Sequence, residues 1–502
     1  MTQLAPSALV AALPQIPVAW LRDRRWFSSK GRQLTELTVS DWGALPLAEP
    51  AIIALARARY ADGFEELLLL PLLATREALP VGVRAPAAAT LTQDGVVWQI
   101  HDAFQHEAFQ RLLMTRLLSG EDLPLTHGRI TFAPEAALRA APPPLREIRL
   151  VAAEQSNTSI IYDHQAILKC FRRVVAGVNP DVEVSRFLTR VGFRHTPALL
   201  GSLSYWRDGV EHSLAILQEF VPNRGDAWDY TLQRLAAFYE AVPTDATLNR
   251  AEQTRRLAAV LLDELRELGR LTGKLHRALA GDAADPDFAP RPLDEAQARA
   301  WQQALHAQAE ATLELLAARR GALPDDLLAV VETLLAARER IRQRIAGLER
   351  LAQAGVLLTR YHGDYHLGQV LVSERGFLIL DFEGEPLRPL AERRAHGSPL
   401  KDVAGMLRSL SYAAQSSLRT ATRRDVDLAP WALAWESEAR GAFLQGYRAA
   451  TAAAPFVPRD AEVFNAALAA FELEKALYEV RYELNNRPDW LPIPLAGIQR
   501  VL

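Results

Sequence analysis

The stretch of sequence that decides the fold lies around residue 370. Residues 361–372 read YHGDYHLGQVLV, and residues 377–386 read FLILDFEGEP. Each segment contains a short apolar run, and turn-forming residues separate the two runs, so the pattern predicts a loop, a strand, a tight turn and a second strand. Such a hairpin brings Asp364, Gln369 and Asp381 together, although Asp381 follows Asp364 by 17 residues.

The spacing of these three side chains is typical of phosphoryl transfer from ATP. That reaction needs a carboxylate to accept the hydroxyl proton and oxygen ligands to hold a divalent metal against the phosphates. Protein-kinase-like enzymes use an Asp, an Asn five residues later and a second Asp after a hairpin. Here Asp364 is the predicted base, and Gln369 and Asp381 are the predicted Mg²⁺ ligands. A surface loop with chance acidic residues is the alternative, and the several matches at fixed spacing argue against it.

The motifs HGDxHxxQ and DFEGEP in these two segments resemble those of the aminoglycoside-phosphotransferase-like kinases, and most closely the maltokinases. The resemblance spans essentially the whole chain. It implies an α+β, bilobal protein-kinase-like fold with a β-rich small lobe, a mainly helical large lobe, ATP in the cleft and an N-terminal β-rich cap domain. The implied reaction moves the γ-phosphoryl group of ATP to the anomeric hydroxyl of maltose. The product, maltose 1-phosphate, feeds α-glucan (glycogen-type) synthesis, often in association with trehalose synthase.

Composition narrows the class of protein. The 502 residues include 57 Lys and Arg against 60 Asp and Glu, a net charge of −3, so no charge excess favours nucleic acid or an anionic membrane as partner. Cys170 is the single cysteine, which excludes an intrachain disulfide. Prolines at positions 6, 14 and 17 interrupt any signal-peptide-like run. We expect a soluble, cytoplasmic protein.

Three segments differ in their patterns. Residues 1–95 contain three strand-like runs, at 34–42, 51–60 and 64–73, and are expected to form the cap. Residues 96–222 are expected to form an intermediate subdomain and the small kinase lobe, and residues 223–502 the helical lobe with the catalytic loop and sugar site. The helical lobe contains long 3.6-residue periodicities at 254–280, 293–320, 324–354 and 460–486.

The predicted small lobe contains strands at 148–153, 159–162 and 166–171. The turn after the first strand lies where kinases have a glycine-rich phosphate loop, but residues 154–159 contain no glycine. Ser156, Asn157 and Thr158 nevertheless offer hydroxyl and amide donors to phosphate, with an ordinary loop as the alternative. The maltokinases have a similar glycine-free turn, and this favours phosphate binding.

Lys169 lies within an apolar strand, where a lysine needs an anionic partner. The kinase interpretation supplies two partners, the α- and β-phosphates of ATP and a glutamate on the following helix. Asn179 and Pro180 predict the start of that helix, and Glu183 is the predicted partner. A lysine that snorkels from an edge strand is the alternative.

Residues 217–223 lie where a kinase fold passes from the small lobe to the large one. Backbone N–H and C=O groups at such a linker can bind the edge of adenine. On position alone, Gln218, Glu219 and Val221 are therefore predicted to border the base.

The last long helix is the predicted acceptor site. Lys475 and Tyr478 share one of its faces, and Tyr482 continues that face one turn later. A polar and aromatic face suits a sugar, whereas an amphipathic helix with tyrosines at its rim is the alternative. The resemblance of the C-terminal tail to that of the maltokinases favours Lys475 and Tyr478 as substrate residues.

Three further residues have two interpretations each. His366 either donates to the γ-phosphate or braces the loop, and Glu383 is a further ligand of the metal or the sugar. Asp402 either orients the catalytic loop or begins a helix.

Two other functions compete with maltose phosphorylation. The first is a kinase of another sugar or amino sugar, such as glucosamine or an aminoglycoside. The second is a non-catalytic nucleotide-binding scaffold, which the presence of Lys169, Asp364, Gln369 and Asp381 argues against.

Overall fold

The computed structural model describes residues 4–76, 86–151, 157–245, 247–386 and 388–502. The chain forms two compact units. The first comprises Met1–Arg190 and Pro197–Pro222, and the second comprises Val191–Thr196 and Asn223–Leu502. Within the described ranges, no helix is both long enough and apolar enough to cross a membrane.

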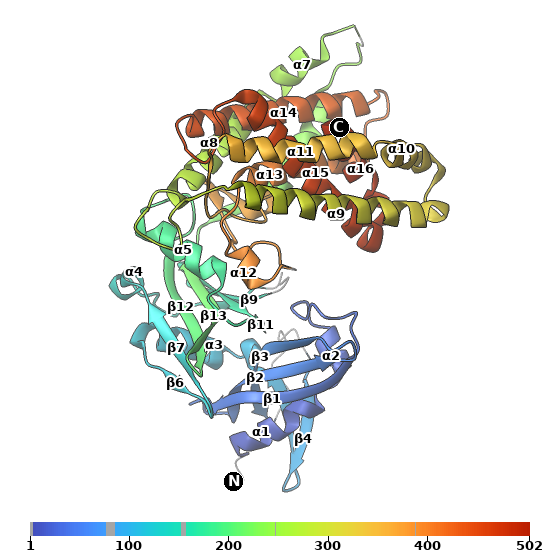
Figure 1. Cartoon of the computed structure of the whole chain (residues 1–502). Helices are drawn as coiled ribbons and strands as arrows, with labels where there is room; N and C mark the ends of the chain where they lie inside the picture. The colour runs from blue at the N-terminus through green and yellow to red at the C-terminus, as the bar shows by residue number, and fades with distance from the viewer. Residues whose placement is uncertain (1–3, 77–85, 152–156, 246, 387) are drawn as a thin grey trace. The chain divides into compact units, whose positions relative to one another are not determined.

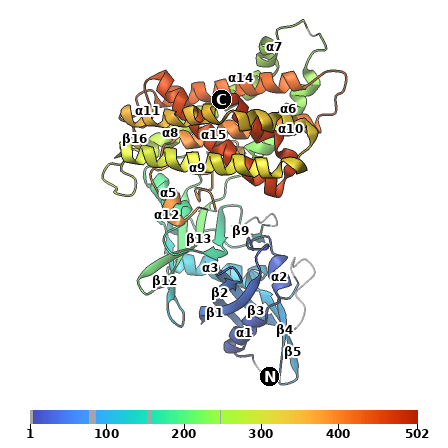
Figure 2. The same cartoon turned by 45° about the vertical axis from the view of Figure 1, so that its right-hand side comes forward.

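The first sheet of the first unit is antiparallel, and its order is β1-β2-β3-β5-β4, with β11 paired to β3. Helices α1 (Pro6–Ala12) and α2 (Val18–Arg22) precede it, and α1 packs on β1, β2 and β3 (Figure 2). The three strand-like runs predicted for the cap are confirmed as β1, β2 and β3. The predicted cap boundary at residue 95 falls in the turn between β4 and β5, and the sheet continues beyond it. The strands are β1 (Leu34–Ala44), β2 (Ala51–Tyr60), β3 (Glu65–Thr75), β4 (Ala89–Gln93), β5 (Val96–Asp102) and β11 (Arg173–Val174).

The second sheet of the first unit is also antiparallel, in the order β6-β7-β12-β13-β10-β9-β8. Helix α3 (Glu107–Ser119) lies in a core shared with the first sheet, and it ends at Gly120, whose left-handed φ of 70° suits glycine. Helices α4 (Ala136–Ala140) and α5 (Pro180–Arg190) pack against β12. The strands are β6 (Leu123–Pro124), β7 (Arg129–Pro134), β8 (Ile148–Leu150), β9 (Asn157–Tyr162), β10 (Ala166–Phe171), β12 (Leu199–Arg207) and β13 (Val210–Glu219).

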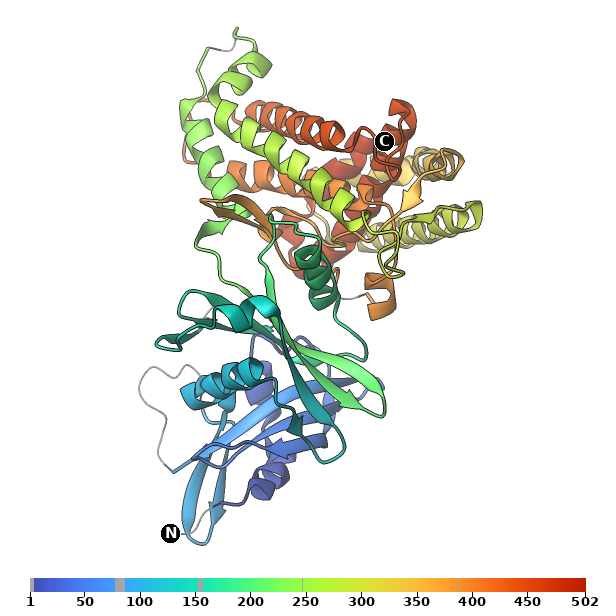
Figure 3. The same cartoon turned by 90° about the vertical axis from the view of Figure 1, so that its left-hand side faces the viewer.

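The second unit is mainly helical (Figure 1). Helix α15 packs against α9, α11, α13 and α16, and α8 lies along α14 (Figure 3). The helices are α6 (Ala227–Ala241), α7 (Arg250–Leu257), α8 (Ala259–Leu279), α9 (Glu295–Arg319), α10 (Asp325–Ala336), α11 (Arg338–Gln353), α12 (Leu390–Arg393), α13 (Leu400–Thr420), α14 (Ala429–Thr451), α15 (Ala461–Asn486) and α16 (Pro492–Val501).

Two of the four predicted long helices are interrupted. Ala258 separates α7 from α8, and Ala337 separates α10 from α11. At both alanines the backbone leaves the helical region, with ψ near 13°. Alanine is the best helix former, so the local sequence contains no stop signal at either position. Packing against neighbouring helices decides where these helices bend.

The predicted catalytic hairpin is confirmed. Strands β17 (Val370–Ser373) and β18 (Gly376–Ile379) pair, and β14 (Asn223–Asp226) extends them to three strands. The loop that contains Asp364 begins after β16 (Leu357–Leu358), which pairs with β15 (Arg291–Pro292), and ends in a short 3₁₀ turn, Leu367–Gln369.

Candidate active site

The catalytic loop places Asp364 beside a cation from the last long helix. Asp364 Oδ1 lies 3.3 Å from Lys475 Nζ on α15. Gly363 precedes it with a φ of 85°, a conformation that favours glycine. A Cβ at Gly405 of α13 would lie 2.7 Å from the carbonyl oxygen of Tyr365, so the loop rests closely on that helix. The two residues that were predicted separately, Asp364 and Lys475, thus lie side by side.

Asp402 holds the backbone of this loop. Its carboxylate accepts hydrogen bonds from the N–H groups of His362 (2.7 Å) and Gly363 (2.9 Å). Asp402 is the third residue of α13 and is buried. Of the two interpretations of Asp402, the structure therefore supports the one in which it orients the loop. A carboxylate between two backbone donors forms short, strong hydrogen bonds.

A buried histidine completes the surroundings of Asp402. His276 of α8 lies 3.0 Å from Asp402 through Nε2 and 3.1 Å from the hydroxyl of Tyr447 through Nδ1. One turn earlier on the same helix, the Thr272 hydroxyl lies 3.0 Å from that of Tyr365. Helix α8 therefore supports the loop directly through Thr272 and through Asp402 by way of His276. Burial raises the pKa of Tyr447 well above its ordinary value, so the phenol stays neutral.

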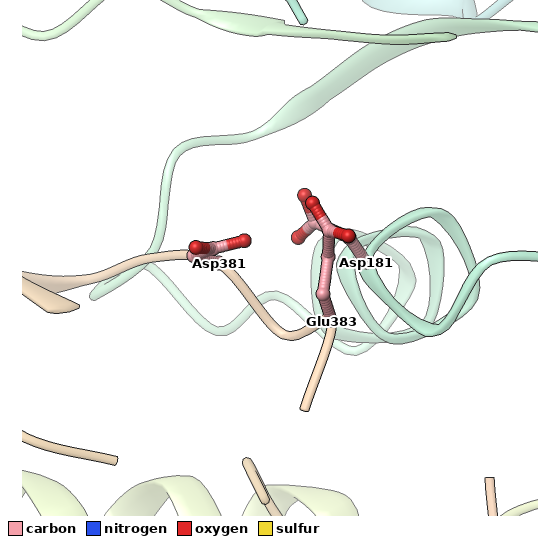
Figure 4. A group of neighbouring side chains, drawn as sticks. All are labelled: Asp181, Asp381 and Glu383. Carbon is pink, nitrogen blue, oxygen red and sulfur yellow. The ribbon is translucent and has the colours of Figure 1, made fainter. Parts of the chain in front are cut away.

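The predicted metal ligands lie at the base of the hairpin. The amide nitrogen of Gln369 lies 3.1 Å from Asp381 Oδ2. Asp381 has a φ of 63°, which is uncommon for a residue other than glycine and is seen more often at functional positions. Glu383 follows on the same loop, and carboxylate oxygens of Asp381 and Glu383 lie within 4.8 Å of one another. Figure 4 shows these two side chains, together with Asp181 on α5.

The two histidines of the motif have bracing contacts. His362 lies 2.8 Å from the carbonyl oxygen of Leu380 through Nε2, which links the loop to the end of the hairpin. His366 Nδ1 accepts a hydrogen bond from the N–H of Gly368. Burial lowers the pKa of His366 below its ordinary value, although the nearby Asp364 carboxylate opposes this shift. Bracing by His366 is therefore observed, and its donation to phosphate stays a prediction.

A cavity of about 570 Å³ opens beside Asp364. Lys475 and Tyr478, the predicted acceptor residues, line it together with Asp364. His366 and Glu383, which we had also expected at the substrate, are not among its lining residues. Glu383 instead lies beside Asp381, and the next residue, Gly384, lines the cavity.

Six charged side chains along this cavity alternate in sign, and we call them the charge chain. Successive nitrogen–oxygen distances along it are 3.3, 2.8, 2.6, 3.8 and 2.9 Å. Burial would raise the pKa of Glu385 and lower that of Lys475. The cations Lys475 and Arg388 outweigh burial at Glu385, and the carboxylates of Asp364 and Glu385 outweigh it at Lys475, so the pKa of Glu385 falls below its ordinary value and that of Lys475 rises. The members, in spatial order, are Asp364, Lys475, Glu385, Arg388, Glu474 and Lys401.

Aromatic rings complete the cavity. Lys475 Nζ lies 5.2 Å from the ring centre of Tyr478, and Tyr361 lines the wall next to Asp364. Burial raises the pKa of both tyrosines, so both hydroxyls are neutral donors at physiological pH. Lys401 lies 5.3 Å from the ring of Phe471. Paired charges and phenolic rings together form a polar surface without a large excess of either sign.

In the first unit, Lys169 forms an ion pair with Asp181, a residue that the sequence analysis did not name. Lys169 Nζ lies 3.2 Å from Asp181 Oδ2. Asn179 caps the helix and Pro180 begins it, as predicted, so Asp181 lies in the first turn. The predicted start of the helix is confirmed, and the pairing of Lys169 with Glu183 stays a prediction.

The predicted phosphate turn is only partly within the described residues. Ser156 lies outside them. Asn157 and Thr158 belong to strand β9 and pair with Phe171 and Cys170 of β10, so they are strand residues and not turn residues. The strand extends two residues further toward the turn than predicted, because the register with β10 continues that far.

The predicted adenine linker is the end of β13. Gln218 is buried, and its amide donates to Ser185 of α5 at 3.1 Å. The N–H of Glu219 donates to the carbonyl oxygen of Ala198. Val221 is buried just before the end of the unit. Contacts of these residues with a nucleotide stay a prediction.

Sequence reasoning missed most of the cavity wall. Glu385 lies inside the motif FLILDFEGEP but received no role. Arg388, Lys401 and Glu474 belong to charged helical segments of the kind that usually face solvent. The proximity of Glu385 to Asp381 was the one available signal. The others became recognisable only through their neighbours in the folded chain.

Two protein-family models match the sequence of this chain. A family model described as the phosphotransferase enzyme family matches residues 147–460, more than half of the chain. The chain belongs to the phosphotransferase enzyme family. A second model, the maltokinase N-terminal cap domain, matches residues 20–105. The predicted recognition, a phosphotransferase with a cap of the maltokinase type, is confirmed.

Two glucosamine kinases are similar in sequence to most of this phosphotransferase. A glucosamine kinase from Mycolicibacterium smegmatis is 30% identical over 387 residues, which are 75% of this chain and 84% of that protein. A glucosamine kinase from Streptacidiphilus jiangxiensis is 28% identical over 367 residues, 72% of this chain and 75% of that protein.

Solved structures confirm the predicted fold class. A glucosamine kinase in complex with glucosamine, ADP and inorganic phosphate has a TM-score of 0.65 and 22% identity, with 100% of both chains covered. Another crystal form of a glucosamine kinase has a TM-score of 0.66 and 21% identity, with 98% of this chain and 99% of that chain covered. This phosphotransferase therefore has the kinase-like fold with an N-terminal cap.

Proposed function

We propose that this phosphotransferase moves the γ-phosphoryl group of ATP to the anomeric hydroxyl of maltose, giving maltose 1-phosphate and ADP. The observation that carries the proposal is the position of Asp364, whose carboxylate opens onto a cavity lined by a polar and aromatic surface. A carboxylate there can accept the proton of a hydroxyl group bound in the cavity. The maltokinase-type cap supports maltose among the possible sugars.

The cavity suits an uncharged, polyhydroxylated acceptor. Its volume of about 570 Å³ is within the usual range for small-molecule sites, about 300–1,000 Å³. The charge chain offers both donors and acceptors to sugar hydroxyls while its charges compensate one another. Tyr478 offers a ring face to the C–H groups of a sugar and a hydroxyl at its rim.

Within the loop, Asp364 holds the attacking hydroxyl and removes its proton as the phosphorus–oxygen bond forms. Asp402 keeps the loop backbone in place, so Asp364 does not need to reorganise during the reaction. Lys475, whose ammonium lies 3.3 Å from Asp364 Oδ1, places a cation beside the proposed base.

The base of the hairpin fits a divalent cation. Two carboxylates and one carboxamide are hard oxygen donors of the kind that Mg²⁺ prefers. The contact between Gln369 and Asp381 shows that both side chains reach the same point, and a half-turn of the amide group would present its oxygen there. Bound Mg²⁺ would neutralise charge on the ATP phosphates, with Asp381, Gln369 and Glu383 as its ligands.

In the first unit, Lys169 is the proposed contact to the ATP phosphates. Asp181 pairs with this lysine and limits its rotamers, since the pair is largely buried. Gln218, Glu219 and Val221 remain the proposed neighbours of adenine, and Asn157 and Thr158 those of the phosphates. Glycogen-type synthesis downstream and association with trehalose synthase are further proposals.

The test is ADP release with Mg²⁺ and ATP against maltose, glucose, glucosamine, trehalose and an aminoglycoside, followed by phosphorus NMR of the product. We expect turnover with maltose and an anomeric phosphate. Turnover with a different sugar alone would keep the kinase and refute maltose. Nucleotide binding without turnover for any sugar would favour the scaffold.

Glucosamine is the second candidate acceptor. Two relatives that are 28–30% identical over about three quarters of this chain are named glucosamine kinases. Cavity charge distinguishes the two candidates, because glucosamine contains an amino group that is cationic when protonated and maltose does not.

A further inference from the structure

The strongest unassigned feature is the position of Lys475 between two carboxylates. Its ammonium lies 2.8 Å from Glu385 Oε1 and 3.3 Å from Asp364 Oδ1, and 5.2 Å from the ring centre of Tyr478. Two carboxylates and an aromatic face are the surroundings that bind an ammonium group from a ligand. Here the chain supplies that ammonium itself.

The rest of the cavity leaves little room for a second cation. Arg388 already pairs with Glu385 at 2.6 Å and lies 3.6 Å from Glu392. Lys401 pairs with Glu474 at 2.9 Å. Each of these carboxylates in the cavity wall therefore has a cation within 4 Å. Asp402, which also lines the cavity, is occupied by the N–H groups of His362 and Gly363 and by His276. A bound ammonium would find each of these lining carboxylates already partnered and would meet the charge of Lys475.

The position of the amino group in an amino sugar would increase its repulsion by Lys475. In a 2-amino sugar, the amino group is on the carbon next to the anomeric carbon. If Asp364 receives the anomeric hydroxyl, the amino group lies close to the contacts of Asp364, which include Lys475. A hydroxyl at that place accepts a hydrogen bond from Lys475, whereas an ammonium is repelled by it.

We infer that Lys475 determines the charge of the acceptor, selecting neutral sugars and excluding amino sugars from this cavity. The inference rests on the proposed function, because it concerns the same acceptor site. It makes Lys475 a specificity-determining residue in addition to a partner of the proposed base. Neutralising it leaves Asp364 without its ion pair, while Glu385 keeps Arg388.

The experiment compares kcat/KM for maltose and glucosamine in wild type, Lys475→Met, Lys475→Met/Glu385→Gln and Lys30→Met. Lys30 is exposed in the first unit and provides the same substitution away from the cavity. We expect wild type to prefer maltose. We expect Lys475→Met to shift the ratio of the two kcat/KM values toward glucosamine by about tenfold to a hundredfold. The added Glu385→Gln should remove only part of that gain, because Glu385 keeps Arg388 and Asp364 is the carboxylate that loses its cation, and Lys30→Met should change nothing.

Lys475 also contacts the proposed base, so its replacement is expected to lower turnover for every sugar. The second readout is therefore the affinity of each sugar for the same proteins, measured by calorimetry. A shift of relative affinity toward glucosamine supports the inference even where turnover is low. Thermal unfolding checks the fold, and Lys475→Gln replaces the methionine variant if that protein does not fold.

Three results would overturn the inference. They are wild-type use of glucosamine equal to that of maltose, a parallel loss for both sugars in Lys475→Met, and an unchanged affinity ratio. These differ from failure of the proposed function, in which the wild-type protein phosphorylates neither maltose nor glucosamine.

Discussion

The catalytic loop and the acceptor cavity of this phosphotransferase are built in opposite ways. The proposed base and metal ligands lie within residues 364–383, one loop and one hairpin. The cavity wall draws side chains from α9, α12, α13 and α15, between Ala307 and Arg481. The residues proposed for phosphoryl transfer are therefore a local arrangement, whereas the proposed acceptor site depends on how helices distant in sequence pack.

This difference leads to separate kinetic predictions for the loop and for the cavity wall. Changes in the loop should lower kcat for every acceptor, because they affect the step common to all of them. Changes in the wall should alter KM and selectivity for the acceptor and leave the use of ATP unaffected. Four predictions test this division, from the largest expected effect to the smallest.

Replacing Asp364 by Asn should lower kcat by about 10²–10⁴-fold while ATP affinity stays near wild type. Asparagine keeps the shape of the side chain but cannot accept the proton. Steady-state ADP release gives kcat, and nucleotide titration gives the affinity. Glu374→Gln, an exposed change in the turn of the same hairpin, is the matched control and should be silent. Near-normal turnover in Asp364→Asn would reject the assignment of the base.

Replacing Asp402 by Asn should lower kcat by roughly tenfold to a hundredfold and leave the KM for the acceptor almost unchanged. The variant keeps one oxygen but loses the second acceptor, so Gly363 or His362 loses its carboxylate partner. The same assay with a melting curve measures both effects. A rise in the acceptor KM with kcat retained would show that Asp402 contributes to acceptor binding and not to the position of the catalytic loop.

Replacing Asp181 by Asn should raise the KM for ATP by about tenfold, the equivalent of one charge-assisted hydrogen bond of about 1.5 kcal/mol. Glu183→Gln is the matched control and should stay within about twofold of wild type. Varying ATP at saturating acceptor provides the measurement. The reverse order of effects would favour Glu183 over Asp181 as the carboxylate on which Lys169 depends.

Replacing Tyr478 by Phe should raise the acceptor KM by about threefold to tenfold, the loss of one neutral hydrogen bond, with kcat and the KM for ATP retained. Tyr482→Phe is the matched control. Tyr482 stacks on Tyr478 with ring centres 6.5 Å apart but is not among the residues lining the cavity. Equal effects of the two changes would show that the cavity extends further along α15 than its described wall.

Local patterns predicted the loop and hairpin well for a physical reason. In a strand–turn–strand unit, the turn determines the pairing of the strands, so the distance along the chain translates directly into position in space. Gln369 and Asp381 meet at 3.1 Å as the spacing required. The ion pair of Lys169 with Asp181 was not predicted, because the rotation of side chains about a helix axis selects among carboxylates that are close together in the sequence.

Prediction was weakest for residues whose neighbours are determined by packing between helices that are distant in the sequence. Arg388, Lys401 and Glu474 have ordinary helical sequence contexts, yet burial beside one another makes them parts of one charge chain. Lys475 lies 111 residues from Asp364 along the chain, and the helix face and the resemblance that pointed to it gave no indication that the two side chains meet. The helix breaks at Ala258 and Ala337 likewise lack a local signal.

The sequence by itself determined the kinase-like motif, the β-rich cap and the set of groups able to hold a metal and accept a proton, because these depend on residue type and short spacing. Only the tertiary structure decided that Asp402 and His276 support the loop and that Lys475 lies between Asp364 and Glu385. Those contacts join helices far apart in the sequence, and side-chain packing between such helices has no counterpart in the local periodicity of the chain.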